Sequence, residues 1–284
     1  MARKPKADRP KYTWGTFGIQ LIALVVSLFF IFPILMIINN AFKTKQELIL
    51  DPPLSLPGSF NLDNFHTAWK KLELGTAFAN SFMYTAISVL LIAMLCTITA
   101  WAIARGGTRL FKAARIYFMI GILIPAQALC LPIYLLWNSM GLINSRVGLI
   151  ALYVSTGLSF GIFLQTNFMK TVPIDIEEAA VIDGCNVYQT FFRVVMPLLK
   201  APMATLIIVQ SFTIWNDFML TNLVVQSKSM RTVILAMKTL FSTSENDYSS
   251  AMAAIILSAT PVIVLFVALQ KQFIKGMTIG AVKG

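Results

Sequence analysis

Six long apolar segments are the feature that most limits what this chain can fold into. About 20 apolar residues in a helix cross the roughly 30 Å hydrocarbon layer of a bilayer. Inside lipid the backbone must satisfy its own hydrogen bonds, which favours helices. The sequence therefore predicts an all-α membrane protein with six transmembrane helices, at about Phe17–Ile38, Phe78–Ala104, Ile116–Trp137, Val147–Phe168, Met203–Val225 and Ala251–Leu269.

Composition and the order of the segments indicate one membrane domain. Only 12% of the residues are charged, against about 25% in a soluble domain. We expect a tail at 1–16 and a transmembrane domain over 17–284. The first apolar segment is too long for a cleaved signal peptide, and no small-x-small cleavage site follows it.

Basic residues are unevenly divided between the two sets of loops. Fifteen of the 23 Lys and Arg residues lie in the two tails and in the loops after spans two and four. The loop after span two is the most one-sided, with Arg105, Arg109, Lys112 and Arg115 and no acid. Because basic loops stay inside the cell, both termini are predicted to be cytoplasmic. Topology also explains the net charge of +11 without a nucleic-acid partner.

Several kinds of chemistry find no support in the sequence. The single histidine, His66, excludes a His-rich metal site. Cys96, Cys130 and Cys185 lack the paired spacing of a disulfide framework or a zinc site, and we interpret them as small apolar side chains. The chain has no G-x-x-x-x-G-K-[ST] motif, so any ATP must be bound by another chain.

The long loop between spans one and two contains an amphipathic pattern. Asn61 is placed as a helix N-cap, and Phe65, Trp69 and Leu72 follow at helical spacing. We expect a short helix that lies on the membrane surface or packs against a partner subunit.

The loop between spans four and five, at about 170–201, predicts a helix–turn–helix. Pro173 suits the first turn of a helix, and Glu177 and Glu178 place negative charge at its positive end. Gly184 suits a left-handed turn. A second helix is expected over Val187–Val195, closed by Pro197.

The 170–201 loop has more apolar residues than a free loop needs. They are Ile176, Val181, Ile182, Val187 and Phe191. Two hypotheses follow: the loop docks into a partner protein, or it rests on lipid headgroups. Taken alone, these residues leave both open.

A motif in this loop resembles the signature of ABC importer permeases, E-A-A-x3-G-x9-I-x-L-P. The matching residues are Glu178, Ala179, Ala180, Gly184, Val194 and Pro197, with Val194 in place of isoleucine and Met196 in place of leucine. Further segments resemble the smaller, six-span subunit of maltose-type, carbohydrate-uptake importers, so that the resemblance covers nearly the whole chain. They are Asp183-Gly184, Phe191, Pro202, Asn80-Ser81, Trp215-Asn216-Asp217 and the ending 276–284.

The resemblance implies a permease subunit that forms half of a translocation pathway for a sugar, an oligosaccharide or a sugar derivative by alternating access. Its partners would be a second permease subunit, two cytoplasmic ATPase subunits and an extracytoplasmic solute-binding protein, in a bacterial-type plasma membrane. This chain would not be an enzyme and would bind no cofactor, since ATP and Mg²⁺ belong to the ATPases. The residues implied to contact the ATPase are Glu178, Ala179, Ala180, Asp183, Gly184, Val187, Val194 and Pro197.

Span five contains the only acidic residue within a predicted span, Asp217. A carboxylate at a helix centre costs about 2.5–3.5 kcal/mol to insert, so it must face protein or water. Gln210, Thr213, Asp217 and Thr221 lie on one helical face, flanked by Asn216. They predict either a polar wall of the translocation path or hydrogen bonds that hold the bundle together.

Two further expectations concern the other spans. Span three carries Pro125 and Pro132 on either side of Gln127, which predicts a kink there. Aromatic residues near the predicted span ends, such as Trp101 and Tyr153, are expected to anchor at the membrane interface.

Two other functions remain as alternatives from the residues. An ion-coupled secondary transporter needs intramembrane carboxylates or broken helices, often in repeated halves. A lone Asp217 and the absence of a repeat count against it. A membrane enzyme needs paired carboxylates, a His cluster or an activated nucleophile within reach. The single histidine outside the spans and the single acid within them count against it.

Overall fold

A computed structural model describes residues 14–242 and 247–281, and all elements in this part of the chain are helical. Most of the predicted N-terminal tail, with its five basic residues, lies outside the described residues, as do the last three residues of the chain. Four long helices dominate: α1 (Trp14–Ala41), α4 (Leu74–Arg105), α7 (Arg146–Met169) and α14 (Tyr248–Ala281). All four are long and apolar enough to cross a membrane, and the number rises to six if each of two bent helix pairs is one span.

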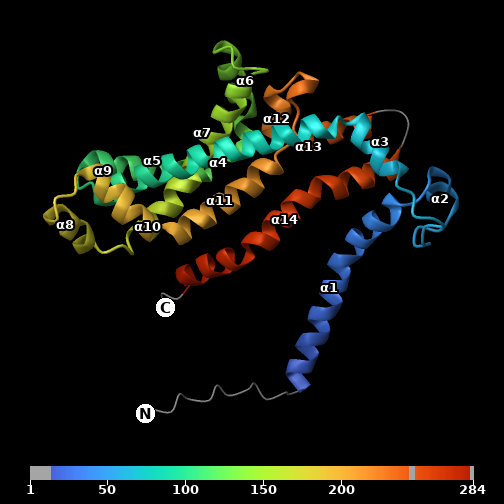
Figure 1. Ribbon diagram of the computed structural model, residues 1–284, viewed down its shortest axis with the longest axis horizontal. Coiled ribbons are helices and arrows are strands. Elements are labelled where there is room, and N and C mark those ends of the chain that lie inside the picture. Colours follow the sequence, from blue (N-terminus) through green and yellow to red (C-terminus); the bar gives the residue numbers. More distant parts are fainter. Residues whose placement is uncertain (1–13, 243–246, 282–284) are drawn as a thin grey trace.

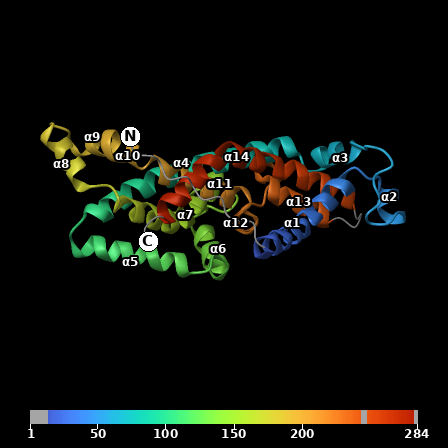
Figure 2. The same ribbon diagram turned by 90° about the horizontal axis from the view of Figure 1, so that it is seen from below.

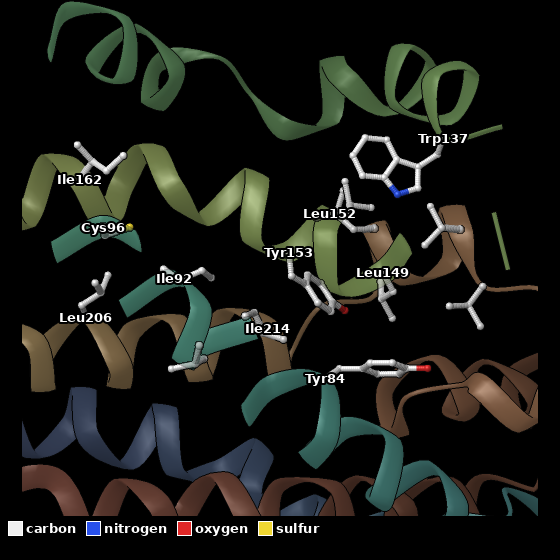
Figure 3. Packing of buried hydrophobic residues seen from close by; sticks show 14 of the residues in the cluster. Tyr84, Ile92, Cys96, Trp137, Leu149, Leu152, Tyr153, Ile162, Leu206 and Ile214 are labelled. Carbon is white, nitrogen blue, oxygen red and sulfur yellow. The ribbon is translucent and has the colours of Figure 1, made fainter. Parts of the chain in front are cut away.

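The core lies between α4, α7 and α11 (Lys200–Trp215). Figure 3 shows Ile92 and Cys96 of α4 beside Ile162 of α7 and Leu206 of α11. A Cβ atom added at Gly161 would lie 2.4 Å from Cys96 Sγ, so the missing side chain lets the two helices approach closely. The interpretation of Cys96 as a small apolar packing residue is therefore confirmed.

Span three is strongly bent, and its helices reach beyond the predicted Ile116–Trp137, starting earlier at Arg109 and ending later at Ser139. It consists of α5 (Arg109–Leu123), the 3₁₀ turn η1 (Ala126–Leu129) and α6 (Cys130–Ser139), and the two halves meet at 96°. The kink expected from Pro125 is confirmed: Ile124 is extended, as a residue before proline prefers. In Figure 1, α6 projects away from the long helices.

The prediction of span five as Met203–Val225 is also wrong. Helix α11 begins earlier, at Lys200, and ends at Trp215, and the short α12 (Met219–Val224) follows after a break. At its start, α11 turns by 75° from the helices that precede it. The sixth span lies in α14 and covers Tyr248–Ala268, close to the predicted Ala251–Leu269, and the helix itself continues to Ala281.

The end of the molecule opposite the 170–201 loop is built from α2 (Lys45–Leu50), α3 (Asp63–Lys71), η3 (Lys228–Met230) and α13 (Val233–Ser242). The predicted surface helix is α3, and it packs against α4 and α14 of its own chain. Its first residue, Asp63, donates its N–H to Asn61 Oδ1 (2.7 Å), although the helix starts one residue later than expected.

Helix α1 meets the rest of the molecule only near its C-terminal end. Ala41 is its only buried residue. From there α1 diverges from α14, and Figures 1 and 2 both show the separation. The apolar side chains of α1 therefore need lipid or another chain around them.

Candidate functional site

The 170–201 loop forms the predicted helix–glycine turn–helix at one end of the molecule (Figure 1). Helix α8 (Ile174–Ile182) ends at a turn in which Gly184 has a φ of +84°. The second helix runs through α9 (Val187–Gln189), the π-helical turn η2 (Thr190–Val195) and α10 (Met196–Leu198). It therefore continues past Pro197, which we expected to close it.

A capping box starts the second helix. Gln189 N donates to Asn186 Oδ1 (2.9 Å), and Asn186 N donates to Gln189 Oε1 (3.0 Å). Such reciprocal bonds satisfy two backbone donors that the first helical turn leaves free. Together with the glycine turn, they make the loop compact.

One side of the loop is buried against the bundle. Phe191, which we had grouped with the candidate docking residues, is only 4% exposed. Its ring lies 5.2 Å from that of Trp101 on α4. A small apolar cluster surrounds this pair, with Met169, Val172, Val195 and Leu199 as its buried members.

The other side of the loop presents apolar residues to the surroundings. Ile182 is 85% exposed and Tyr188 is 76% exposed, and Val181 and Val187 are also exposed. We call these four residues the apolar patch. Exposed apolar patches of this kind mark interaction sites.

The remaining motif residues are divided between the two sides. Glu178, Ala179, Asp183 and Pro197 are exposed, whereas Ala180 is buried and Val194 is half-buried. The motif therefore contributes both to the exposed side and to the attachment of the loop.

Glu177 attaches α8 to α4 by a buried ion pair that the sequence did not reveal. Arg105 donates to Glu177 Oε1 through both Nε (2.9 Å) and Nη2 (2.7 Å), and Trp101 Nε1 donates to Glu177 Oε2 (2.9 Å). Arg105 Nη2 also donates to the carbonyl of Val172 (2.8 Å). The indole N–H of Trp101 is therefore used to bind this carboxylate.

Asp217 lies in the break between α11 and α12, where it caps α12. Its Oδ2 accepts from Tyr153 Oη (3.0 Å), Thr221 N (2.8 Å) and Thr221 Oγ1 (2.8 Å), and its Oδ1 accepts from Leu220 N (3.1 Å). Tyr153, expected at the membrane interface, is instead buried in the bundle. The hydrogen-bonding alternative for Asp217 is therefore present in the structure.

A cavity of about 370 Å³ lies beside this break. Three of the five residues predicted to face the translocation path line it: Gln210, Thr213 and Asp217. Thr221 is buried, and Asn216 is exposed and donates to the carbonyl of Phe212 (2.9 Å). The predicted single helical face is wrong, because the helix ends before Asp217.

Helix α7 supplies part of the cavity wall that the sequence analysis did not identify. Tyr153, Thr156 and Phe160 line it, one helical turn apart. The cavity therefore combines hydroxyl, amide and aromatic groups.

Comparison with known proteins identifies the family. Residues 94–279 match the family described as "Binding-protein-dependent transport system inner membrane component". The chain belongs to this family. The resemblance to ABC importer permeases is thereby confirmed.

Individual relatives support the same assignment. The chain is 33% identical to the probable starch degradation products transport system permease protein AmyC of Thermoanaerobacterium thermosulfurigenes, over 93% of this chain and 96% of that one. It is 32% identical to the melibiose/raffinose/stachyose import permease protein MelC of Bacillus subtilis (strain 168), over 94% and 96%.

A solved structure has the same fold. A chain of a bacterial ABC transporter involved in the import of the acidic polysaccharide alginate matches with a TM-score of 0.82, at 22% identity, over 93% of this chain and 100% of that chain.

Proposed function

We propose that this chain is the permease subunit of an ABC importer that carries a sugar, an oligosaccharide or a sugar derivative by alternating access. The relatives named for starch degradation products and for melibiose, raffinose and stachyose support this substrate class. The chain would form half of the pathway, and a second permease subunit would form the other half. A solute-binding protein would deliver the substrate, in keeping with the family description.

The single observation that carries the proposal is the apolar patch on an anchored loop. A patch that rests only on lipid headgroups needs no rigid attachment, whereas docking into a partner that moves does. The buried side of the loop and the Glu177 ion pair supply that attachment. We therefore place the patch in a surface of a cytoplasmic ATPase subunit.

This assignment places the loop and both termini in the cytoplasm of a bacterial-type plasma membrane. The basic loop after span two, at the same end of the molecule, supports that orientation. ATP and Mg²⁺ would be bound by the ATPases, so this chain would have no cofactor and no catalytic residue.

The cavity beside Asp217 is our candidate for part of the path. Tyr153, Gln210 and Thr213 offer hydrogen-bonding groups, and Phe160 offers an aromatic surface. A hydroxyl-rich substrate needs both kinds of contact while it moves. Ion coupling through Asp217 is less well supported, because its carboxylate already accepts four hydrogen bonds from its own chain.

The test is ATP-driven uptake in vesicles that hold the complete complex. We expect Ile182→Asp to abolish uptake and to release the ATPase subunits, because it places a charge in the docking surface. Leu56→Asp, at an equally exposed apolar residue outside the loop, is the matched control and should leave uptake intact. Uptake that continues without ATPase subunits would show that the proposal is wrong.

A further inference from the structure

We propose that α4 is a strut that joins the 170–201 loop to the segment Ser227–Val233 at the opposite end of the molecule, so that the two move together. This inference rests on the proposed function, because it concerns how a movement at the ATPase reaches the other side of the membrane. Three observations carry it: an attachment at each end of α4 and an uninterrupted helix between them.

The first attachment joins α4 to the loop. Arg105 and Trp101 both bind the carboxylate of Glu177, whose side chain is 9% exposed. The Trp101 ring also packs on Phe191 of the second loop helix. Helix α4 therefore holds both halves of the loop, and a displacement of either half reaches it directly.

The second attachment joins α4 to Ser227–Val233. Asn80 Nδ2 donates to the carbonyls of Ser229 (2.9 Å) and Arg231 (3.0 Å). Tyr84 Oη donates to the carbonyl of Met230 (3.2 Å). Val233 N donates to Ser81 Oγ (2.9 Å).

These three side chains of α4 are almost completely buried. Asn80 is 4% exposed, Ser81 is 2% exposed and Tyr84 is 0% exposed. Buried polar groups are costly to leave unpaired, so the segment cannot slide along α4 without replacing these bonds. In the sequence, Asn80-Ser81 was only one of the segments that resemble the family. In the structure, this pair holds the Ser227–Val233 segment on α4.

Between the attachments, α4 is one helix of 32 residues without an internal proline. Asn80 and Arg105 are about 37 Å apart at 1.5 Å per residue. Close packing on α7 at Gly157 and Gly161 supports the middle of the helix. A helix packed in this way transmits a displacement instead of absorbing it.

The segment at the far end lies next to the candidate path. Ser227–Val233 follows α12, and Met219 and Leu220 of α12 line the cavity beside Asp217. The backbone N–H of Ser227 also donates to Asn144 Oδ1 (2.9 Å) at the start of the segment. Movement of the segment would therefore change the surroundings of the cavity at the end away from the ATPases.

The experiment follows the far-end segment while ATP acts at the loop end. In the complete complex, with the native cysteines replaced, a spin label at Lys228→Cys reports the position of this exposed residue. Its spectrum is compared without nucleotide and with ATP trapped by a non-hydrolysing ATPase. Uptake and ATP hydrolysis are measured in parallel on the hydrolysing complex.

We expect Glu177→Gln and Asn80→Ala each to reduce the ATP-dependent change at the label by about 5-fold or more, as loss of a typical coupling does. Uptake should fall with it, while ATP hydrolysis persists. The double variant should lose little more than either single variant, because both interrupt the same connection. Asp175→Asn, at an exposed acid of the same helix as Glu177, and Asn138→Ala, at an exposed asparagine of α6, are the controls and should respond like wild type.

Trp101→Phe provides a second variant in case Glu177→Gln fails to assemble. It keeps the ring contact with Phe191 but removes the N–H donor to Glu177. The strut is wrong if the wild-type complex transports but neither end of α4 matters for the label. That outcome is an unchanged label response in the single variant Asn80→Ala and also in Glu177→Gln or Trp101→Phe. The proposed function would then stand. If the wild-type complex shows no ATP-dependent uptake, the proposed function fails, and the strut fails with it.

Discussion

At the residue scale, Gly184 shows that backbone conformation and not space requires a glycine. Its φ is +84°, yet a Cβ atom added there would meet nothing within 4 Å. The left-handed region costs an ordinary residue about 1–2 kcal/mol, whereas asparagine enters it more readily. We predict that Gly184→Val lowers uptake and loop stability markedly, and that Gly184→Asn lowers them little. Equal uptake by the two variants would contradict this account.

Asp247 holds the start of α14 at the end opposite the loop. Its side chain is 3% exposed and lies 3.1 Å from Lys71 Nζ and 3.7 Å from Lys45 Nζ. Burial raises the pKa of this carboxyl, but hydrogen bonds from Lys71 and Ser250 and the charge of Lys45 outweigh burial, so the pKa is lower than its ordinary value of 3.8. The charged form is therefore the one that stabilises the fold.

We predict that Asp247→Asn lowers the free energy of unfolding by about 1.5–3 kcal/mol at neutral pH, the value of a hydrogen bond to a charged group. Because the folded-state pKa is lowered, this contribution is complete above the ordinary value of 3.8, which the unfolded chain keeps, and is lost as the pH falls through the lower folded value. Thermal unfolding of both proteins from pH 7 to about pH 3.5 measures it. A difference that already disappears near pH 6 would assign the effect to another group.

Glu177 and Glu178 show where residue-level prediction stopped. Both are adjacent acids of α8, and only the motif, which includes Glu178 alone, distinguishes them in the sequence. Neighbouring residues on a helix point about 100° apart, so one was bound to face the bundle more than the other. Which one does so depends on how the loop packs on α4, and that information lies in Trp101 and Arg105, more than 70 residues away.

At the element scale, the apolar segments of the sequence predicted the positions of the helices more accurately than the positions of the breaks within them. Pro125 marked the bend in span three correctly. The break at Asn216–Phe218 contains neither proline nor glycine. It is held instead by the carboxylate of Asp217, which accepts hydrogen bonds from Thr221 N of α12 and from Tyr153 Oη. Averaging hydropathy over a window of about 20 residues cannot detect such a break, because the single charged residue Asp217 changes the average of an apolar segment very little.

The contact between α4 and α7 depends on the absence of a side chain at Gly161. A Cβ there would lie 2.4 Å from Cys96 Sγ and 3.2 Å from Cys96 Cβ. We predict that Gly161→Ala destabilises the protein by about 1–3 kcal/mol, the usual cost of overpacking. Cys96→Ala should recover part of that loss when the two changes are combined, because it removes the sulfur atom that the new methyl group meets.

The matched control for Gly161 is Gly18→Ala in α1, where a Cβ meets nothing within 4 Å. This change should leave thermal unfolding in detergent almost unaffected. Equal losses at Gly161 and Gly18 would indicate that helix flexibility, and not the α4–α7 contact, determines the effect.

At the scale of the whole molecule, the described part of the chain leaves large apolar surfaces uncovered by its own residues. Helix α1 leaves the bundle, and the apolar patch of the 170–201 loop lies exposed at one end. Both features indicate a subunit whose stability is completed by assembly. A partner that binds only the folded state stabilises it by mass action, by about 2.7 kcal/mol when its concentration is 100 times the dissociation constant.

We therefore predict that adding purified ATPase subunits raises the unfolding temperature of the detergent-solubilised permease in a concentration-dependent way. Ile182→Asp should remove this rise without lowering the unfolding temperature of the permease alone, because Ile182 is 85% exposed and contributes little to the fold. Leu56→Asp should retain the full rise, since Leu56 lies outside the loop. A rise of equal size in the Ile182→Asp protein would mean that the ATPase binds a surface other than the apolar patch, and the docking surface would then have to be sought elsewhere on this end of the molecule.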